Sequence, residues 1–114
     1  MKYDLEERTL EFAKNIIRLC KKLPNNTVNF KLVDQIIRSG SSIGANYREA
    51  NDGLSKKDFI NRLRISRKEA KETSFWLELI VEANNEFRNE AEFLMDECVQ
   101  LRNILSSIIS KSSL

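Results

Sequence analysis

The stretch that decides the fold is residues 36–50, which read IIRSGSSIGANYREA. Its apolar residues recur at helical spacing, with Ile36, Ile43 and Tyr47 on one face and Gly40 in the middle of that face. A glycine inside a helix costs about 1 kcal/mol relative to alanine, so we interpret the glycines of this stretch as sites of close helix packing. A phosphate-binding loop is excluded, because the required spacing and the following lysine and hydroxyl residue are missing.

The remaining chain also has helical periodicity. Segments 55–84 and 89–109 each place apolar or small residues at alternating steps of four and three. In the first of these segments the middle residues Ser66, Ala70 and Thr73 are small, and we expect them to face the small residues of 36–50. The tail after residue 109 is expected to fray. We predict an all-α, antiparallel, up-down-up-down four-helix bundle, a single domain over residues 1–114 with helices at about 4–23, 27–50, 55–84 and 89–109.

Composition limits the cellular setting. Cys20 and Cys98 both lie on apolar helical stripes, which indicates core thiols in a reducing compartment rather than a disulfide. No apolar run approaches the roughly 20 residues that span a membrane, and the charged start does not have the pattern of a signal peptide. We therefore expect a cytoplasmic protein with no membrane partner.

Catalysis finds little support in the residue types. The chain has no histidine, the commonest general base and metal ligand. Glu69 and Glu72 lie one turn apart, but the Glu-x-x-His motif of metal-binding bundles is absent, so we interpret the pair as an ion-paired or solvated face. We expect no catalytic residue, no metal site and no cofactor; an enzyme would need a carboxylate site that this pattern does not reveal.

The charges are unevenly distributed, with a basic stretch over residues 56–71 and an acidic one over 78–97. Helical spacing places most of the basic side chains opposite the apolar seam, on the side that also carries Phe75. Such a row is able to follow a phosphate backbone and stack on an unpaired base. The alternative is a solvated face with Phe75 in a subunit contact. The candidate nucleic-acid-binding residues are Lys57, Arg64, Arg67, Lys68 and Lys71.

More apolar side chains are present than one stripe per helix requires. Aligned apolar residues outside the seams, a tryptophan among them, are typical of an interface. The alternative is a wider core than a simple seam predicts. The predicted oligomer-interface residues are Leu10, Ile17, Ile65, Trp76, Leu79, Phe93 and Ile104.

A polar set, Arg38, Ser42, Asn46 and Glu49, lies on the outer side of residues 36–50. Packing within one bundle does not require these side chains. We interpret them as a structural network, bonded to the third helix or to a neighbouring subunit, rather than as a ligand site.

Three segments together resemble a known family: residues 35–50, QIIRSGSSIGANYREA, then 55–59, SKKDF, and 65–73, ISRKEAKET. They are similar to the four-helix bundle proteins encoded by intervening sequences in 23S ribosomal RNA genes. The chain departs from the family pattern at Ala50, where glycine is usual, and at Lys68-Glu69, where Gly-Ser is frequent. The matching residues are Arg38, Ser42, Ile43, Asn46, Glu49, Ser55, Asp58, Phe59 and Glu72.

The resemblance implies a ring-shaped homopentamer of four-helix bundles whose biochemical role is poorly defined. Relatives include an accessory protein of diversity-generating retroelements that binds a reverse transcriptase and nucleic acid. No catalytic residue is implied. We therefore predict a non-enzymatic homo-oligomer that binds RNA or another nucleic acid through the basic face of its third helix. The alternative is an oligomeric scaffold or accessory factor whose partner is a protein, such as a reverse transcriptase.

Overall fold

The structure, a computed structural model, describes residues 4–113. No strand occurs within that range, and the prediction of an all-α fold with four helices is confirmed. These described residues form four α-helices and one short 3₁₀ helix: α1 (Leu5–Lys22), α2 (Thr27–Asn51), α3 (Lys56–Ala83), η1 (Asn85–Phe87) and α4 (Arg88–Ser112).

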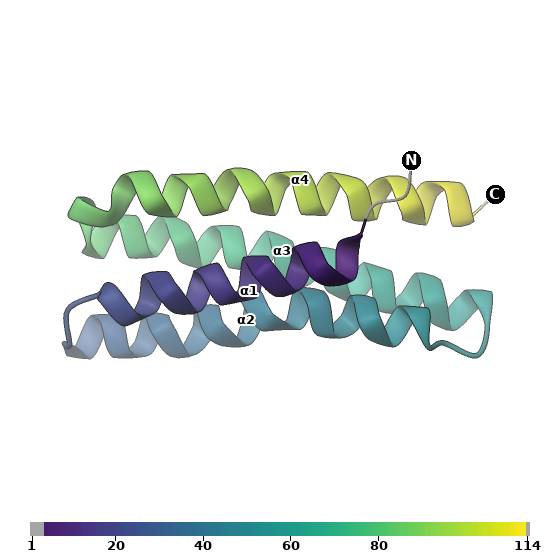
Figure 1. Ribbon diagram of the computed structural model, residues 1–114, viewed down its shortest axis with the longest axis horizontal. Coiled ribbons are helices and arrows are strands. Elements are labelled where there is room, and N and C mark those ends of the chain that lie inside the picture. The colour runs from purple at the N-terminus through teal and green to yellow at the C-terminus, as the bar shows by residue number, and fades with distance from the viewer. Residues whose placement is uncertain (1–3, 114) are drawn as a thin grey trace.

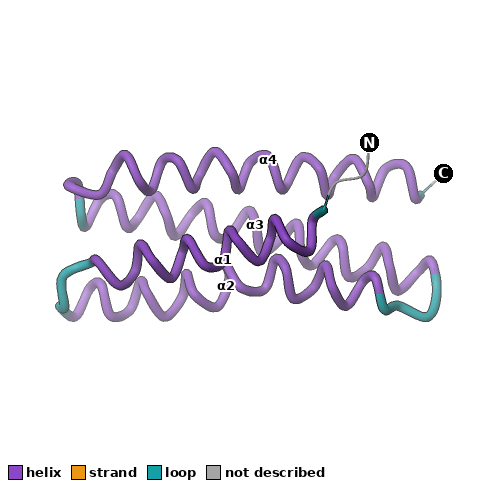
Figure 2. The backbone as a smooth tube through the Cα atoms, viewed as in Figure 1, coloured by secondary structure: helices purple, strands orange, loops and turns teal. Residues whose placement is uncertain are grey.

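The helices run alternately up and down along a bundle that measures 46 × 23 × 20 Å (Figure 1). The α1–α2 and α3–α4 connections lie at one end, and the α2–α3 connection lies at the other (Figure 2). Each helix contacts its neighbours in sequence, and α4 contacts α1. This arrangement is an antiparallel, up-down-up-down four-helix bundle, in which α1 and α3 are diagonal.

Helix ends follow local sequence signals. Asp4, Asn26 and Ser55 cap α1, α2 and α3 by accepting a hydrogen bond from the backbone N–H three residues further on. The end of α4 differs from the expectation, because the helix continues to Ser112 where fraying was predicted from residue 110. The side chain of Ile109 explains this difference: it is buried against the bundle and anchors the last turns.

All four helices contribute to one hydrophobic core. Its side chains come from the predicted seams, and burying each large one contributes about 1.5–3 kcal/mol. The largest fully buried apolar residues are Phe12, Leu5, Ile16, Leu19, Ile36, Ile43, Leu63, Leu77, Ile80, Leu101 and Leu105.

The glycines of α2 face α1, so they are the exception among the small residues of 36–50 that were expected to meet the third helix. A Cβ added at Gly40 would lie 3.3 Å from Cγ1 of Ile16, and one added at Gly44 would lie 2.7 Å from Oγ1 of Thr9. Ser39 and Ile43 each precede one of these glycines by one position, so they lie about 100° away around the helix and meet α3 instead. Thus α2 packs on α1 through its glycines and on α3 through Ser39 and Ile43.

Hydroxyl groups mediate that second contact. The Oγ of Ser66 donates to the carbonyl oxygen of Ile43 at 2.7 Å, and Thr73 Oγ1 lies 2.9 Å from Ser39 Oγ. All these side chains are buried. The small residues of α3 therefore do face residues 36–50, as predicted.

A reciprocal amide pair joins the start of α2 to the end of α3. Asn29 Nδ2 donates to Asn84 Oδ1, and Asn84 Nδ2 donates to Asn29 Oδ1, both at 2.8 Å. Each residue is 2% exposed, and each amide also donates to a backbone carbonyl. Because a buried amide needs its partners, this pair fixes the register of α2 against α3.

Candidate functional site

A cationic cavity lies where the outer face of α3 meets α4. Its volume is about 410 Å³, and none of the described residues that line it is acidic. Most of the lining comes from α3, at spacings of three and four residues that place side chains on one side of a helix. The residues of this cationic cavity are Arg64, Arg67, Lys68 and Lys71 of α3 and Arg102 of α4.

The buried seam of α3 determines where these cations point. Leu63, Ser66 and Ala70 are fully buried, so the opposite side of the helix faces solvent. Arg67 is half-buried because it turns towards α4, where its Nη1 lies 3.4 Å from the Oγ of Ser106. Arg102 is half-buried on the α4 side of the cavity.

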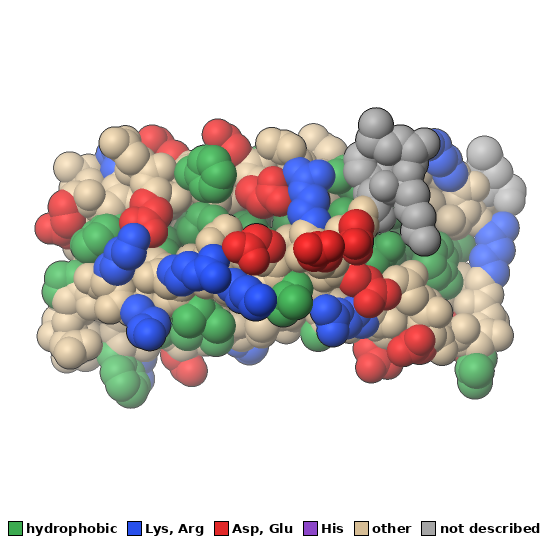
Figure 3. Space-filling model, viewed as in Figure 1, with side chains coloured by type: hydrophobic (Ala, Val, Ile, Leu, Met, Phe, Trp, Pro, Cys, Tyr) green, Lys and Arg blue, Asp and Glu red, His purple; other side chains and the backbone are tan. Residues whose placement is uncertain are grey.

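None of the five cations of the cavity is in an ion pair within residues 4–113. The α1 side of the bundle is different. There cationic, anionic and apolar side chains lie together on the surface (Figure 3), and ion pairs include Arg8–Glu97 and Lys22–Glu90. Unpaired cations around a cavity concentrate positive potential and attract anions.

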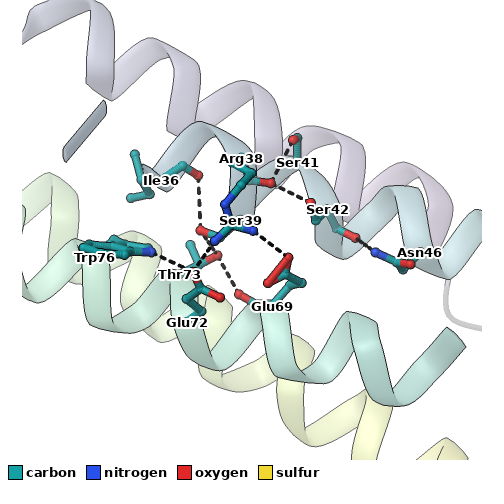
Figure 4. Close-up of polar contacts among 10 residues, drawn as sticks. All are labelled: Ile36, Arg38, Ser39, Ser41, Ser42, Asn46, Glu69, Glu72, Thr73 and Trp76. Carbon is teal, nitrogen blue, oxygen red and sulfur yellow. Dashed lines mark hydrogen bonds and ion pairs between the residues drawn. The ribbon is translucent and has the colours of Figure 1, made fainter. Parts of the chain in front are cut away.

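Arg38 of α2 binds two carboxylates of α3, which lie on the same stretch of that helix as the cations of the cavity. Its Nη1 donates to Glu69 Oε2 at 3.0 Å, and its Nη2 donates to Glu72 Oε1. Trp76 Nε1 also donates to Glu72 Oε1, at 3.2 Å. Figure 4 shows the guanidinium group between the two helices, with both carboxylates directed towards it. These carboxylates thus face α2 and not the cationic cavity.

The two carboxyl groups titrate differently. Burial raises the pKa of Glu69, and a hydrogen bond to Glu72 raises it further, against the lowering effect of Arg38. For Glu72, burial opposes the net change, but hydrogen bonds from Trp76 and Glu69 and the charge of Arg38 lower its pKa. Glu72 is therefore favoured as the ionised partner of Arg38, and Glu69 keeps its proton to a higher pH.

The other members of the predicted polar set do not form a single site with Arg38. Ser42 Oγ donates to the carbonyl oxygen of Arg38 at 2.6 Å, and Asn46 Nδ2 donates to the carbonyl oxygen of Ser42 at 2.9 Å. Arg62 of α3 donates to Asn46 Oδ1 at 3.3 Å. Glu49 lines a separate cavity beside the α2–α3 connection. Most of the set therefore bonds within the bundle.

The sequence placed Arg64, Lys68 and Lys71 on one side of α3 with Arg67 beside them, and all four line the cavity. Two details differ. Lys57 is exposed and does not line the cavity, since it lies two turns before Arg64. Arg102 was missed. The one signal for it is that no other lysine or arginine occurs between Arg88 and Lys111 of α4.

The predicted interface residues divide by exposure. Leu10, Ile17, Ile65 and Phe93 are exposed, at 42%, 45%, 40% and 69%. Trp76, Leu79 and Ile104 are half-buried, and the first and last of them pack against the core. Sequence reasoning missed two more exposed side chains at the start of α2, Val28 and Phe30, which are 58% and 76% exposed.

Both thiols are free and buried, as predicted. Burial raises the pKa of Cys20 to about 11 and that of Cys98 to about 12. They are therefore protonated near neutral pH and are poor nucleophiles. Among residues 4–113, no three histidine, cysteine, aspartate or glutamate side chains are grouped so that they are able to hold a metal ion. No helix in the described range has the length and hydropathy needed to cross a bilayer.

The fold and the cavity together define a four-helix bundle protein with a cationic cavity between α3 and α4, whose cations form no ion pair with any residue from 4 to 113. The chain belongs to the 23S rRNA-intervening sequence protein family, whose model matches residues 1–107. The resemblance inferred from residues 35–73 is thereby confirmed.

A solved structure supports this assignment. The chain is similar to a Bacteroides thetaiotaomicron protein of unknown function from the S23 ribosomal protein family, with 43% sequence identity and a TM-score of 0.83. The similarity covers 91% of this chain and 96% of the other. A search of curated proteins found no match.

Proposed function

We propose that this protein is a non-enzymatic homo-oligomer that binds RNA or another nucleic acid through the basic face of α3. The observation that carries the proposal is the cationic cavity, in which five cations surround one space and none is in an ion pair within the described range. Lysine and arginine contacts to phosphates supply most of the affinity of non-specific nucleic-acid binding.

A role without catalysis is supported by the state of the reactive groups. Burial leaves both thiols protonated, and Arg38 occupies the carboxylate pair. Assembly into a ring-shaped homopentamer is the form that the family resemblance implies. It is supported by exposed apolar side chains on all four helices, of which Phe93 is an example at 69% exposure.

The test is binding of a fluorescent RNA, followed by anisotropy at several salt concentrations. The variant Arg64→Glu/Lys68→Glu/Lys71→Glu reverses three charges of the cationic cavity. A matched control, Lys14→Glu/Lys21→Glu/Lys31→Glu, changes the net charge equally at exposed positions of α1 and α2. We expect affinity to fall at least tenfold in the first variant alone, and the salt dependence to weaken by about 0.7 per lost phosphate contact.

Two outcomes would contradict this function. One is no RNA binding even at low salt. The other is an equal loss of affinity in both triple variants, because that result would show that only the total charge matters and not the cavity.

The alternative, a scaffold or accessory factor for a protein such as a reverse transcriptase, is favoured by the surface at the start of α2. Phe30 is 76% exposed there, and with Val33 it lines two neighbouring cavities of about 510 and 380 Å³. Exposed aromatic side chains are frequent anchors of protein interfaces. A Phe30→Ser variant that keeps RNA affinity but loses co-purification with a reverse transcriptase would support this second function.

A further inference from the structure

The outer face of α3 carries one large aromatic side chain directly after the cationic cavity. Phe75 follows Lys71 by one helical turn and Lys68 by two, so helical spacing places all three on the same side. Its side chain is 52% exposed. A ring in this position lies where a strand held by the cavity would continue.

Neighbouring side chains limit the motion of this ring. The ring centroids of Phe75 and Trp76 are 5.3 Å apart, with an edge-on interplanar angle of 69°. Trp76 is in turn held by Glu72, to which its Nε1 donates. Edge-to-face contacts favour a defined ring orientation, so the Phe75 ring packs on Trp76 while part of it stays exposed to solvent.

The charge of the helix changes sign after Phe75. Glu78 and Glu82 follow by three and seven residues, on the same side of α3, and both are exposed. Carboxylates repel phosphates, so favourable phosphate contacts along α3 end near Lys71. The next group available to a bound strand is therefore an aromatic ring, which favours a base over a phosphate.

We propose that α3 binds single-stranded nucleic acid, with phosphates in the cationic cavity and an unpaired base stacked on Phe75. This inference rests on the proposed function and adds the class of nucleic acid. Stacking of a base on an aromatic side chain needs an exposed base face. A duplex buries those faces between its base pairs and offers only their edges.

The test uses the full chain and three fluorescein-labelled probes at low salt: a 12-nucleotide RNA, the blunt duplex of that RNA, and a 12-unit abasic strand that keeps the phosphates but lacks bases. We expect the single strand to bind more tightly than the duplex and the abasic strand. Phe75→Ala should weaken single-strand binding by about 5-fold or more and leave the other two probes unchanged. Phe75→Trp should restore the preference.

Phe30→Ala is the matched control, since it removes an exposed phenylalanine on α2 and should not alter binding. Equal affinity for single strand and duplex, or an equal effect of Phe75→Ala on all three probes, would overturn the inference and leave the proposed function standing. Absence of binding to every probe would remove both. A change in particle mass on Phe75→Ala, with no change in the preference for single strands, would show that the ring serves a subunit contact and would also overturn the inference.

Discussion

Arg38 binds the two carboxyl groups that lie among the basic residues of α3. It binds Glu69 and Glu72 on the α2 side, while the cationic cavity lies towards α4. One guanidinium group thus lies against two carboxyl groups that lie one turn apart. Burial raises the pKa of Glu69 despite this contact, whereas hydrogen bonds from Trp76 and Glu69 and the charge of Arg38 lower the pKa of Glu72.

These pKa changes act on stability in opposite pH ranges. Between the ordinary glutamate value of 4.5 and the raised pKa of Glu69, the folded protein binds a proton that the unfolded chain releases. The free energy of unfolding therefore falls as pH rises through that range, by at most about 1.4 kcal/mol per pH unit. Glu72 has a lowered pKa, so its contribution is present above 4.5 and is lost as pH falls below it.

We predict that Glu69→Gln removes the fall in stability above pH 4.5, and that Glu72→Gln removes the fall in stability below it. The measurement is urea unfolding followed by circular dichroism between pH 3.5 and 7.5, for the wild type and each variant. The difference between wild type and Glu69→Gln should change only above pH 4.5, and the difference between wild type and Glu72→Gln only below it. If the first difference stays flat across this range, Glu69 titrates normally.

At the scale of the element, α2 has two packing faces with different chemistry. Its glycines admit α1, and Ser39 and Ile43 meet the hydroxyl groups of α3. Thr9 is especially constrained, because it is 1% exposed and its Oγ1 donates to the carbonyl oxygen of Leu5 at 2.6 Å. A methyl group at Gly44 would displace that hydroxyl.

We predict that Gly44→Ala destabilises the protein by about 1–3 kcal/mol through overpacking, although alanine is the better helix former. Gly40→Ala is the matched control and should cost less, since its nearest neighbour at 3.3 Å is a side-chain carbon of Ile16. Adding Thr9→Ala to Gly44→Ala should recover part of the loss in a double-mutant cycle. Equal effects of the two glycine substitutions would contradict the close contact at Thr9.

The helices could be predicted because their apolar residues repeat along the whole length of each element. The sequence could not predict which neighbouring helix each face packs against, because small residues occur on both faces of α2, only about 100° apart. The same limit applies to the site. The spacing of Arg64, Lys68 and Lys71 placed them on one side of α3, but the contribution of Arg102 depends on how α4 packs beside that helix.

At the scale of the whole molecule, exposed apolar side chains favour assembly. We predict that the protein is an oligomer at micromolar concentration, and that Phe93→Glu/Ile17→Glu lowers its mass to that of a monomer. Both side chains are exposed, at 69% and 45%, so the helices should remain intact. Light scattering coupled to size exclusion measures the mass, and circular dichroism checks the fold.

Leu54→Glu is the control for this experiment. Leu54 lies in the α2–α3 connection and is 97% exposed. Its replacement therefore tests whether the loss of any exposed apolar side chain is enough to lower the mass. The mass should not change in this variant. A wild-type protein that is monomeric under these conditions would rule out the predicted assembly.

The position of Trp76 also gives the molecule an intrinsic optical reporter. It is the chain's one tryptophan, and its indole contacts both Glu72 and the ring of Phe75. Trp76 therefore lies between the ion-paired side of α3 and its outer face. Changes in the charge of Glu72, or in what covers Phe75, alter the surroundings of a single chromophore, so the emission of the unlabelled protein reports on both faces of α3.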